Sequence, residues 1–273
     1  MHHTIFYVSD GTGITVETLG NTLLTQFQHF ELRKIHHPYI DSDEKIKAVA
    51  EEIDQTAKTD HNPPIVFNTL VVEEHRKILG ACEALHFDLF DLFIKPMEEN
   101  LGLKSNRGIG RSHGIGVFDT YKSRIDAIHF AMVNDDGSSV DNYASSDVIM
   151  LGVSRCGKTP TCIYLALNYG IHAANYPLTT DDLNDNRLPE FLRPHRKKIY
   201  GLSINPNRLH QIREERRPNS KYATLSQCQY EVRTALSLFQ KEKIPYLDTS
   251  TISIEEIAAY LMQQKQLKRR INS

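Results

Sequence analysis

The pattern G-x-x-x-x-G-K-[ST], at residues 152–159, restricts the possible folds of this chain more than any other feature. An apolar run, Val148–Leu151, precedes it and predicts a buried strand. A helix is expected after it, with Pro160 near its first turn and Gly170 as a stop. This strand–loop–helix context is the one in which such a loop binds phosphate, and it makes a chance match in an ordinary turn the weaker interpretation.

The loop supplies the candidate binding residues. Its glycines let successive backbone N–H groups point into one concavity, and the following helix N-terminus adds a partial positive charge. Lys158 is expected to neutralise a terminal phosphate, and the Thr159 hydroxyl to hold Mg²⁺. The residues predicted to bind nucleotide or phosphate are Gly152, Val153, Ser154, Arg155, Cys156, Gly157, Lys158 and Thr159.

Three further positions bear on the chemistry. Asp181 and Asp182 follow the next predicted strand, where a carboxylate could accept a proton from an incoming hydroxyl, or could cap a helix. A second acid that binds Mg²⁺ would be expected after the buried run Ile199–Ile204, but the residue there is Asn205. The turn with Asp135 and Asp136 could bind Mg²⁺ or simply be solvated.

The N-terminal half repeats a strand–helix alternation. Thr4–Val8 predicts a strand, and the turn Ser9–Gly13 leads into a helix. This turn is a second possible anion site, or a tight turn with Thr12 as helix cap. Asp10 lies at the strand's carboxyl end, where open α/β sheets place functional groups. The rhythm predicts a parallel sheet with helices on its faces.

The predicted fold is therefore α/β, with an N-terminal parallel-sheet domain followed by a P-loop kinase-like α/β domain. We place the first domain at residues 1–101 and the P-loop domain at residues 146–273. Residues 102–145 are expected to form a linker and a connecting helix, because Gly102–Gly116 contains five glycines and few large apolar residues. The linker pattern Arg107–Gly114 could touch phosphate, but a flexible connection explains it better.

Composition excludes several classes of protein. A net charge of −2 over 273 residues gives no general attraction to nucleic acid or anionic membranes. No apolar run approaches the ~20 residues of a membrane span, and four unpaired cysteines suit a reduced, cytoplasmic protein. Residues 187–221 carry 10 Lys+Arg against 3 Asp+Glu, and Arg213 and Arg216 there share a helix face that could bind phosphate.

Several stretches together resemble one protein family. They are SDGTG near the start, GVSRCGKTPT at the loop, AANYP after it, the IREER helix and the closing SIEEIA. These motifs are similar to those of the bacterial regulators of phosphoenolpyruvate synthase, within a broader family that includes regulators of pyruvate, phosphate dikinase. The similarity spans nearly the whole chain, and the GKT ending favours the synthase branch.

The resemblance implies a bifunctional enzyme that acts on phosphoenolpyruvate synthase. One activity would be a serine/threonine kinase that uses ADP to phosphorylate and inactivate the synthase. The other would remove that phosphate with inorganic phosphate as acceptor and release pyrophosphate. Lys158 would neutralise the transferred group, and Arg155 could add charge in the transition state. Where the family has aspartate-proline this chain has Asn205-Pro206, which argues against a metal role there.

Two other functions remain compatible with the sequence. One is an ATP-dependent P-loop kinase of a small metabolite, and the other is a nucleotide-gated inhibitor without catalytic activity. The absence of a carboxylate at Asn205 is the feature that gives the second alternative weight. A homodimer is plausible from the family resemblance.

Overall fold

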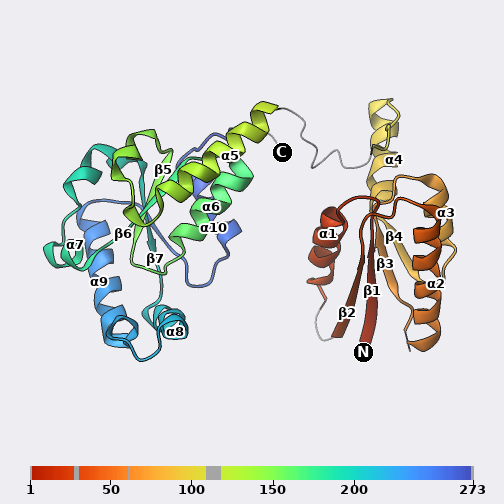
Figure 1. Cartoon of the computed structure of the whole chain (residues 1–273), viewed down its shortest axis with the longest axis horizontal. Coiled ribbons are helices and arrows are strands. Elements are labelled where there is room, and N and C mark those ends of the chain that lie inside the picture. Colours follow the sequence, from red (N-terminus) through yellow and green to blue (C-terminus); the bar gives the residue numbers. More distant parts are fainter. Residues whose placement is uncertain (1, 28–30, 61, 109–117, 272–273) are drawn as a thin grey trace. The chain divides into compact units, whose positions relative to one another are not determined.

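The computed structural model describes residues 2–27, 31–60, 62–108 and 118–271. The chain divides into two compact units, residues 1–114 and 115–273. Each is described by itself, with the element labels of Figure 1. The linker pattern after Gly108 lies outside the described residues. In the described ranges, no helix is both long enough and apolar enough to cross a membrane.

The first unit is built on a four-stranded parallel sheet of order β2-β1-β3-β4. Phe6, in the central strand, faces Ile35 on one side and Val66 on the other. The strands are β1 (His2–Val8), β2 (Glu31–His37), β3 (Ile65–Asn68) and β4 (Leu85–Asp88). The helices are α1 (Ile14–Leu24), α2 (Asp43–Thr59), α3 (Glu73–Gly80) and α4 (Leu89–Leu101).

Helices cover both faces of this sheet, as Figure 1 shows. Successive residues of a strand point to opposite faces, so β1 contributes to two cores. Tyr7 packs with Val16 of α1 on one face, whereas Phe6 packs with Ile46 of α2 on the other. The parallel α/β prediction for the N-terminal half is confirmed.

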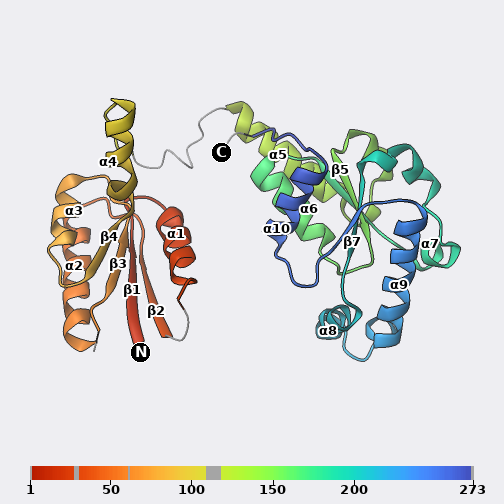
Figure 2. The ribbon, with the colours of Figure 1, turned by 180° about the vertical axis from the view of Figure 1, so that it is seen from behind.

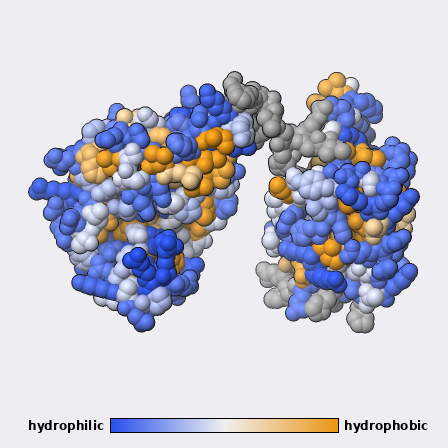
Figure 3. Space-filling view, viewed as in Figure 1, coloured by the Kyte–Doolittle hydropathy of each residue, from blue (hydrophilic) through white to orange (hydrophobic). Residues whose placement is uncertain are grey.

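The apolar stretch at the end of this unit is a strand followed directly by a helix. The Asp88 side chain ends β4 and accepts hydrogen bonds from the backbone N–H groups of Phe90 and Asp91, which starts α4. Figure 3 shows apolar side chains on the surface of α4. The large apolar residues of α4 that are more than half exposed are Leu92, Phe93, Met97 and Leu101.

The second unit contains a four-stranded parallel sheet of order β6-β5-β7-β8, whose middle strands β5 and β7 are labelled among the helices of this unit in Figure 2. Its strands are β5 (Val148–Gly152), β6 (Ala173–Pro177), β7 (Ile199–Ser203) and β8 (Tyr246–Asp248). Its α-helices are α5 (Phe118–Val133), α6 (Lys158–Tyr169), α7 (Thr180–Asp185), α8 (Pro206–Arg216), α9 (Leu225–Lys241) and α10 (Ile254–Gln264). Its 3₁₀ segments are η1 (Asp135–Gly137), η2 (Val140–Ser145), η3 (Glu190–Lys198) and η4 (Lys221–Ala223).

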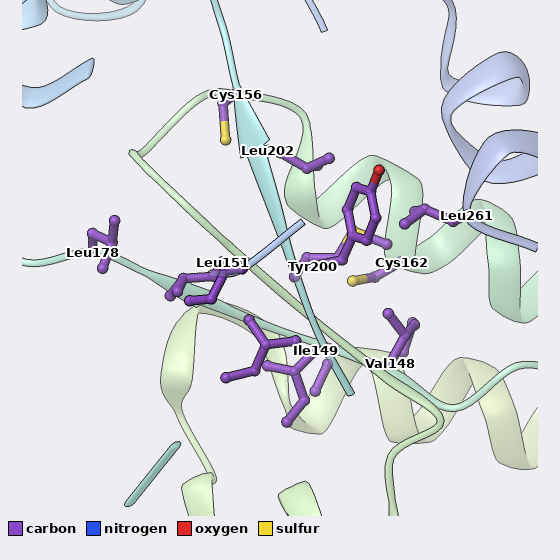
Figure 4. Packing of buried hydrophobic residues seen from close by; sticks show 14 of the residues in the cluster. Val148, Ile149, Leu151, Cys156, Cys162, Leu178, Tyr200, Leu202 and Leu261 are labelled. Carbon is purple, nitrogen blue, oxygen red and sulfur yellow. The ribbon is translucent and has the colours of Figure 1, made fainter. Parts of the chain in front are cut away.

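The core of the second unit surrounds β5. All five residues of β5 are buried, as expected for a central parallel strand with both faces covered. Figure 4 shows Ile149 and Leu151 of this strand, with Tyr200 and Leu202 from β7 in the same cluster. Helix α5, part of the segment expected to connect the domains, packs on α6 and so lies within this unit.

Both sheets have the same order of strands. In each, the first strand is central, the second lies on one side of it and the third on the other. The strand order therefore reverses between β1 and β3, and again between β5 and β7. Ligands of open α/β sheets bind at such reversal points, outside the carboxyl ends of the strands. The loop at residues 152–159 leaves β5 at this point.

Candidate phosphate-binding site

Glycines shape the loop between β5 and α6. A Cβ on Gly152 would lie 2.4 Å from the carbonyl oxygen of Leu202 and 2.8 Å from Cys156 Sγ, so a side chain does not fit there. Gly157 has φ +96° and caps α6 without a side chain, and a Cβ placed on it would meet nothing within 4 Å. Arg155 adopts φ +74°, an uncommon conformation for a non-glycine residue. The backbone therefore adopts a left-handed conformation at two positions, Arg155 and Gly157, within the six residues from Gly152 to Gly157.

Lys158 and the start of α6 give this loop its positive charge. The Lys158 side chain is only 4% exposed, and its Nζ donates a 2.8 Å hydrogen bond to the carbonyl oxygen of Val153. The ammonium therefore lies across the loop it belongs to. Unpaired N–H groups at a helix N-terminus attract anions, and a phosphate oxygen is a stronger acceptor for an ammonium than a neutral carbonyl. The loop fits a phosphoryl group.

A buried arginine donates a hydrogen bond to the backbone of the loop. Arg213 Nη2 donates to the carbonyl oxygen of Ser154 at 3.0 Å and to Glu231 Oε2 at 2.6 Å. Its guanidinium carbon lies 4.0 Å from the centre of the Tyr222 ring, and the Tyr222 hydroxyl donates to Ser154 Oγ at 2.9 Å. We call Arg213, Tyr222 and Glu231 the Arg213 clamp.

The Arg213 clamp corrects one expectation. Arg213 is fully buried, so its guanidinium cannot bind an incoming phosphate together with exposed Arg216. Burial disfavours the charged form, but the hydrogen bond that Arg213 donates to Glu231, together with the nearby charge of that carboxylate, raises the pKa of Arg213 overall. The ordinary preference of arginine for the surface is overcome by a paired carboxylate.

Cys156 is a packing residue of the loop. Its side chain is 1% exposed and points inward in Figure 4. Burial raises the pKa of its thiol, so the reactive thiolate is disfavoured. The Cys156 carbonyl oxygen accepts a 3.0 Å hydrogen bond from Thr249 Oγ1, which connects the loop to the segment after β8.

Thr159 lies beside a carboxylate. Its Oγ1 donates to Asp135 Oδ1 at 2.8 Å, and Asn175 Nδ2 donates to the same oxygen at 2.5 Å. Hydroxyl and carboxylate oxygens are the hard ligands that Mg²⁺ prefers, so this pair fits a magnesium–phosphate complex. Of the two turn aspartates, Asp135 contacts the loop through Thr159, whereas Asp136 is exposed.

The other candidate acids lie apart from these contacts. Asp182 Oδ2 accepts hydrogen bonds from Thr179 N at 2.8 Å, from Thr179 Oγ1 at 2.7 Å and from the Tyr176 hydroxyl at 3.0 Å. Asp182 therefore forms the capping box of α7, the alternative left open by the sequence. Asp181 is exposed, and in the described residues its carboxylate accepts no hydrogen bond.

Asn205 is a helix cap. Its Oδ1 accepts hydrogen bonds from the backbone N–H groups of Asn207, at 2.9 Å, and of Arg208, at 3.4 Å. Asparagine is among the best residues at such a position. The side chain after β7 is thus used to start α8, and it supplies no carboxylate.

The corresponding turn of the first unit is closed by its own hydrogen bonds. Ser9 Oγ accepts from Gly11 N at 3.1 Å, and Asp10 Oδ2 accepts from Val71 N at 2.7 Å. Burial raises the pKa of the Asp10 carboxyl. The capping residue of α1 is Gly13, with φ +79° and no side-chain cap, so the alternative that Thr12 caps this helix is wrong.

Sequence reasoning missed the residues that hold the loop from a distance. Tyr222, Glu231, Thr249 and Asn175 are each at least 16 residues from the loop in sequence. Asn175 and Arg213 do lie within the AANYP and IREER stretches, so the family resemblance marked their neighbourhood without indicating their roles.

Known proteins are similar to this chain over nearly its full length. The family model described as kinase/pyrophosphorylase matches residues 5–262. A protein of Hahella chejuensis is 49% identical over 271 residues, covering 99% of this chain and all of that protein. Proteins of Alcanivorax borkumensis and Ectopseudomonas mendocina are 48% and 46% identical with the same coverage. All three carry the name phosphoenolpyruvate synthase regulatory protein. The chain belongs to the kinase/pyrophosphorylase family of phosphoenolpyruvate synthase regulators.

Proposed function

We propose that the protein inactivates phosphoenolpyruvate synthase by ADP-dependent phosphorylation of a threonine, and reactivates it by phosphate-dependent removal of that group. The synthase enters as partner from the names of the relatives, and the two activities from the family resemblance. One observation carries the proposal for this chain. The loop has the curl, the lysine and the helix N-terminus that hold a single phosphoryl group, whichever molecule brings it.

In the kinase direction, the threonine hydroxyl of the synthase attacks the β-phosphorus of ADP. The bond from that phosphorus to the bridging oxygen breaks, AMP leaves, and the hydroxyl proton passes to a base. Such a transfer depends mainly on positioning and on neutralising charge. Lys158 would leave the Val153 carbonyl for a phosphate oxygen, and exposed Arg155 would reach the transferred group from the loop.

In the other direction, an oxygen of inorganic phosphate attacks the phosphothreonine. The bond from phosphorus to the threonine oxygen breaks, that oxygen regains a proton, and pyrophosphate leaves. The two directions need the same binding site, because ADP and pyrophosphate both present a terminal phosphoryl group linked to a second phosphate.

The base is proposed to be Asp181. Both Asp181 and Asp182 are candidates from the sequence, but Asp182 Oδ2 already accepts three hydrogen bonds in the capping box. The exposed Asp181 carboxylate accepts no hydrogen bond from the residues that the structure describes, so it is available to accept a proton. Mg²⁺, held through Thr159, would neutralise charge on the phosphates. A cytoplasmic location follows from the proposed partner.

The test replaces Lys158 and measures both activities on the purified synthase. We expect Lys158→Met, which keeps most of the side-chain stem, to lower the rates of phosphorylation and of dephosphorylation by about 10²–10³-fold. Lys241→Met, at the exposed end of α9, serves as the control and should retain both rates. Circular dichroism checks that each variant is folded.

Three outcomes would contradict the proposal. Full activity of Lys158→Met in both directions would show that the loop does not hold the transferred group. Turnover of a small molecule with ATP alone would favour a metabolite kinase. Inhibition of the synthase without any mass increase of its threonine would favour a nucleotide-gated inhibitor.

A further inference from the structure

The loop does not supply the carboxylate that a Mg²⁺ site for phosphoryl transfer needs. P-loop enzymes hold Mg²⁺ with the loop hydroxyl and with a carboxylate from elsewhere in the domain. In this chain the position after β7 is Asn205, whose oxygen caps α8. The metal site of the proposed function therefore needs its acid from another element.

Asp135 lies where that acid is needed. It belongs to η1, which precedes β5 in the chain, and its Oδ1 accepts the 2.8 Å hydrogen bond from Thr159 Oγ1. Thr159 is the loop residue whose hydroxyl is expected to bind the metal. The two residues are separated by 24 positions, so their contact is a product of the fold.

The position of Asp135 is held by Asn175. This residue of β6 is fully buried, and its Nδ2 donates to Asp135 Oδ1 at 2.5 Å. Its Oδ1 accepts from Asp136 N at 3.2 Å, and its own N–H donates to the carbonyl oxygen of Asn134 at 3.2 Å. Asn175 thus fixes the backbone and the carboxylate of η1 together, which is the arrangement that orients a metal ligand.

We infer that Asp135 is the carboxylate of the Mg²⁺ site, an assignment that rests on the proposed function. Its Oδ1 accepts from Thr159 and Asn175, while its Oδ2 accepts no hydrogen bond from the residues that the structure describes. That oxygen is available to the metal or to one of its waters. Mg²⁺ is usually held by one or two carboxylates, several waters and the substrate phosphates.

The site is completed by the nucleotide. Among the described residues, no group of three or more His, Cys, Asp or Glu side chains could hold a metal ion. One hydroxyl and one carboxylate bind Mg²⁺ weakly, so phosphate oxygens of the nucleotide and water molecules would supply the remaining ligands. The metal should therefore bind tightly only to the complex with ADP.

A purely structural role of Asp135 makes a different prediction. Asp135→Asn keeps an oxygen that accepts from Thr159 and Asn175, but it replaces Oδ2 with a donor and removes the negative charge. If Asp135 only ties η1 to the loop, this change leaves metal binding unaltered. If Asp135 is a ligand, metal binding is weakened while the loop stays in place.

The experiment uses Mn²⁺ as a paramagnetic substitute for Mg²⁺. Electron paramagnetic resonance measures Mn²⁺ bound to the full chain with and without ADP, and calorimetry measures ADP binding without metal. We expect Asp135→Asn to weaken Mn²⁺ binding to the ADP complex by about 10–100-fold, as loss of a metal-site partner does. ADP binding without metal should stay within about twofold of the parent protein, since the loop contacts remain. Asp136→Asn, one residue along and exposed, is the matched control and should match the parent in both.

The outcomes separate this inference from the proposed function. Unchanged Mn²⁺ binding to Asp135→Asn with ADP would overturn the inference and leave the proposed function standing. Equal loss in Asp136→Asn would also overturn it, because general electrostatics would then explain the effect. Failure of the parent protein to bind ADP at all would instead refute the proposed function.

Discussion

Replacing Arg213 by methionine tests whether the buried ion pair holds the phosphate loop. The change keeps a long apolar stem but removes the donors to Ser154, Tyr222 and Glu231. The Glu231 side chain is only 13% exposed, so its carboxylate would lose the partner that compensates for burial. Removing one member of a buried pair costs about 3–5 kcal/mol. Gln227 still donates to Glu231 Oε1 at 2.9 Å, which argues for the lower end, about 3 kcal/mol.

The assay is urea unfolding, monitored by circular dichroism, with and without ADP. ADP should shift only the transition of the unit that binds it, which identifies that unit in a chain of two. Arg213→Met should lower the free energy of unfolding for this transition and weaken ADP binding. Arg216→Met, exposed on the same helix, should change it by less than about 0.5 kcal/mol.

A double substitution separates the ion pair from simple packing. Adding Glu231→Gln to Arg213→Met neutralises the buried carboxylate, so part of the lost stability should return. The reasoning would be refuted by an Arg213→Met protein within about 0.5 kcal/mol of the parent. It would equally be refuted if the effects of the two substitutions on the free energy of unfolding were additive, because Arg213 and Glu231 would then not stabilise the protein as a pair.

Two further predictions concern other carboxylates. Asp181→Asn should slow phosphorylation of the synthase without changing the affinity for ADP, as measured by initial rates and calorimetry, because a base acts only on the proton in transit. In the first unit, burial would raise the pKa of Asp91, but hydrogen bonds from Arg107 and Lys95 lower it to about 2. The stabilisation is therefore complete above about pH 4 and lost as the pH falls towards 2. Asp91→Asn should cost about 1 kcal/mol at pH 7 and much less near pH 2, where half of the carboxyls are protonated in the folded protein, as measured by urea unfolding.

The sequence predicted the loop because its determinants are local. A strand of apolar residues, glycines at fixed spacing and a helix start all lie within about 20 residues of chain, and each follows from backbone sterics or burial. The same applies to the strand–helix alternation that predicted the parallel sheet of the N-terminal domain. The apolar run Phe87–Phe93 does not itself indicate where a strand ends and a helix begins, because this boundary depends on the single Asp88 side chain that caps α4.

Contacts between distant segments could not be predicted in this way. Arg213 sits in a strongly basic stretch, and composition alone indicates an exposed helix there. Its burial depends on Glu231, 18 residues later, and on the Ser154 carbonyl, 59 residues earlier. Likewise Asp135 contacts Thr159, 24 residues later in the chain, and the same carboxylate oxygen accepts a hydrogen bond from Asn175 of β6.

The candidate phosphate site of the second unit and the corresponding turn of the first unit have similar backbones. In each, the first strand leads through a short loop into a helix capped by a glycine in the left-handed region, Gly13 in one and Gly157 in the other. The first residue of the helix is Ile14 in the first unit and Lys158 in the second. In the first turn Asp10 Oδ2 accepts a hydrogen bond from Val71 N, so a carboxylate already occupies the place where a phosphate would bring further negative charge. The shared topology places a helix N-terminus after the first strand in both units, and in the second unit Lys158 adds there the cation that the proposed phosphoryl transfer would use.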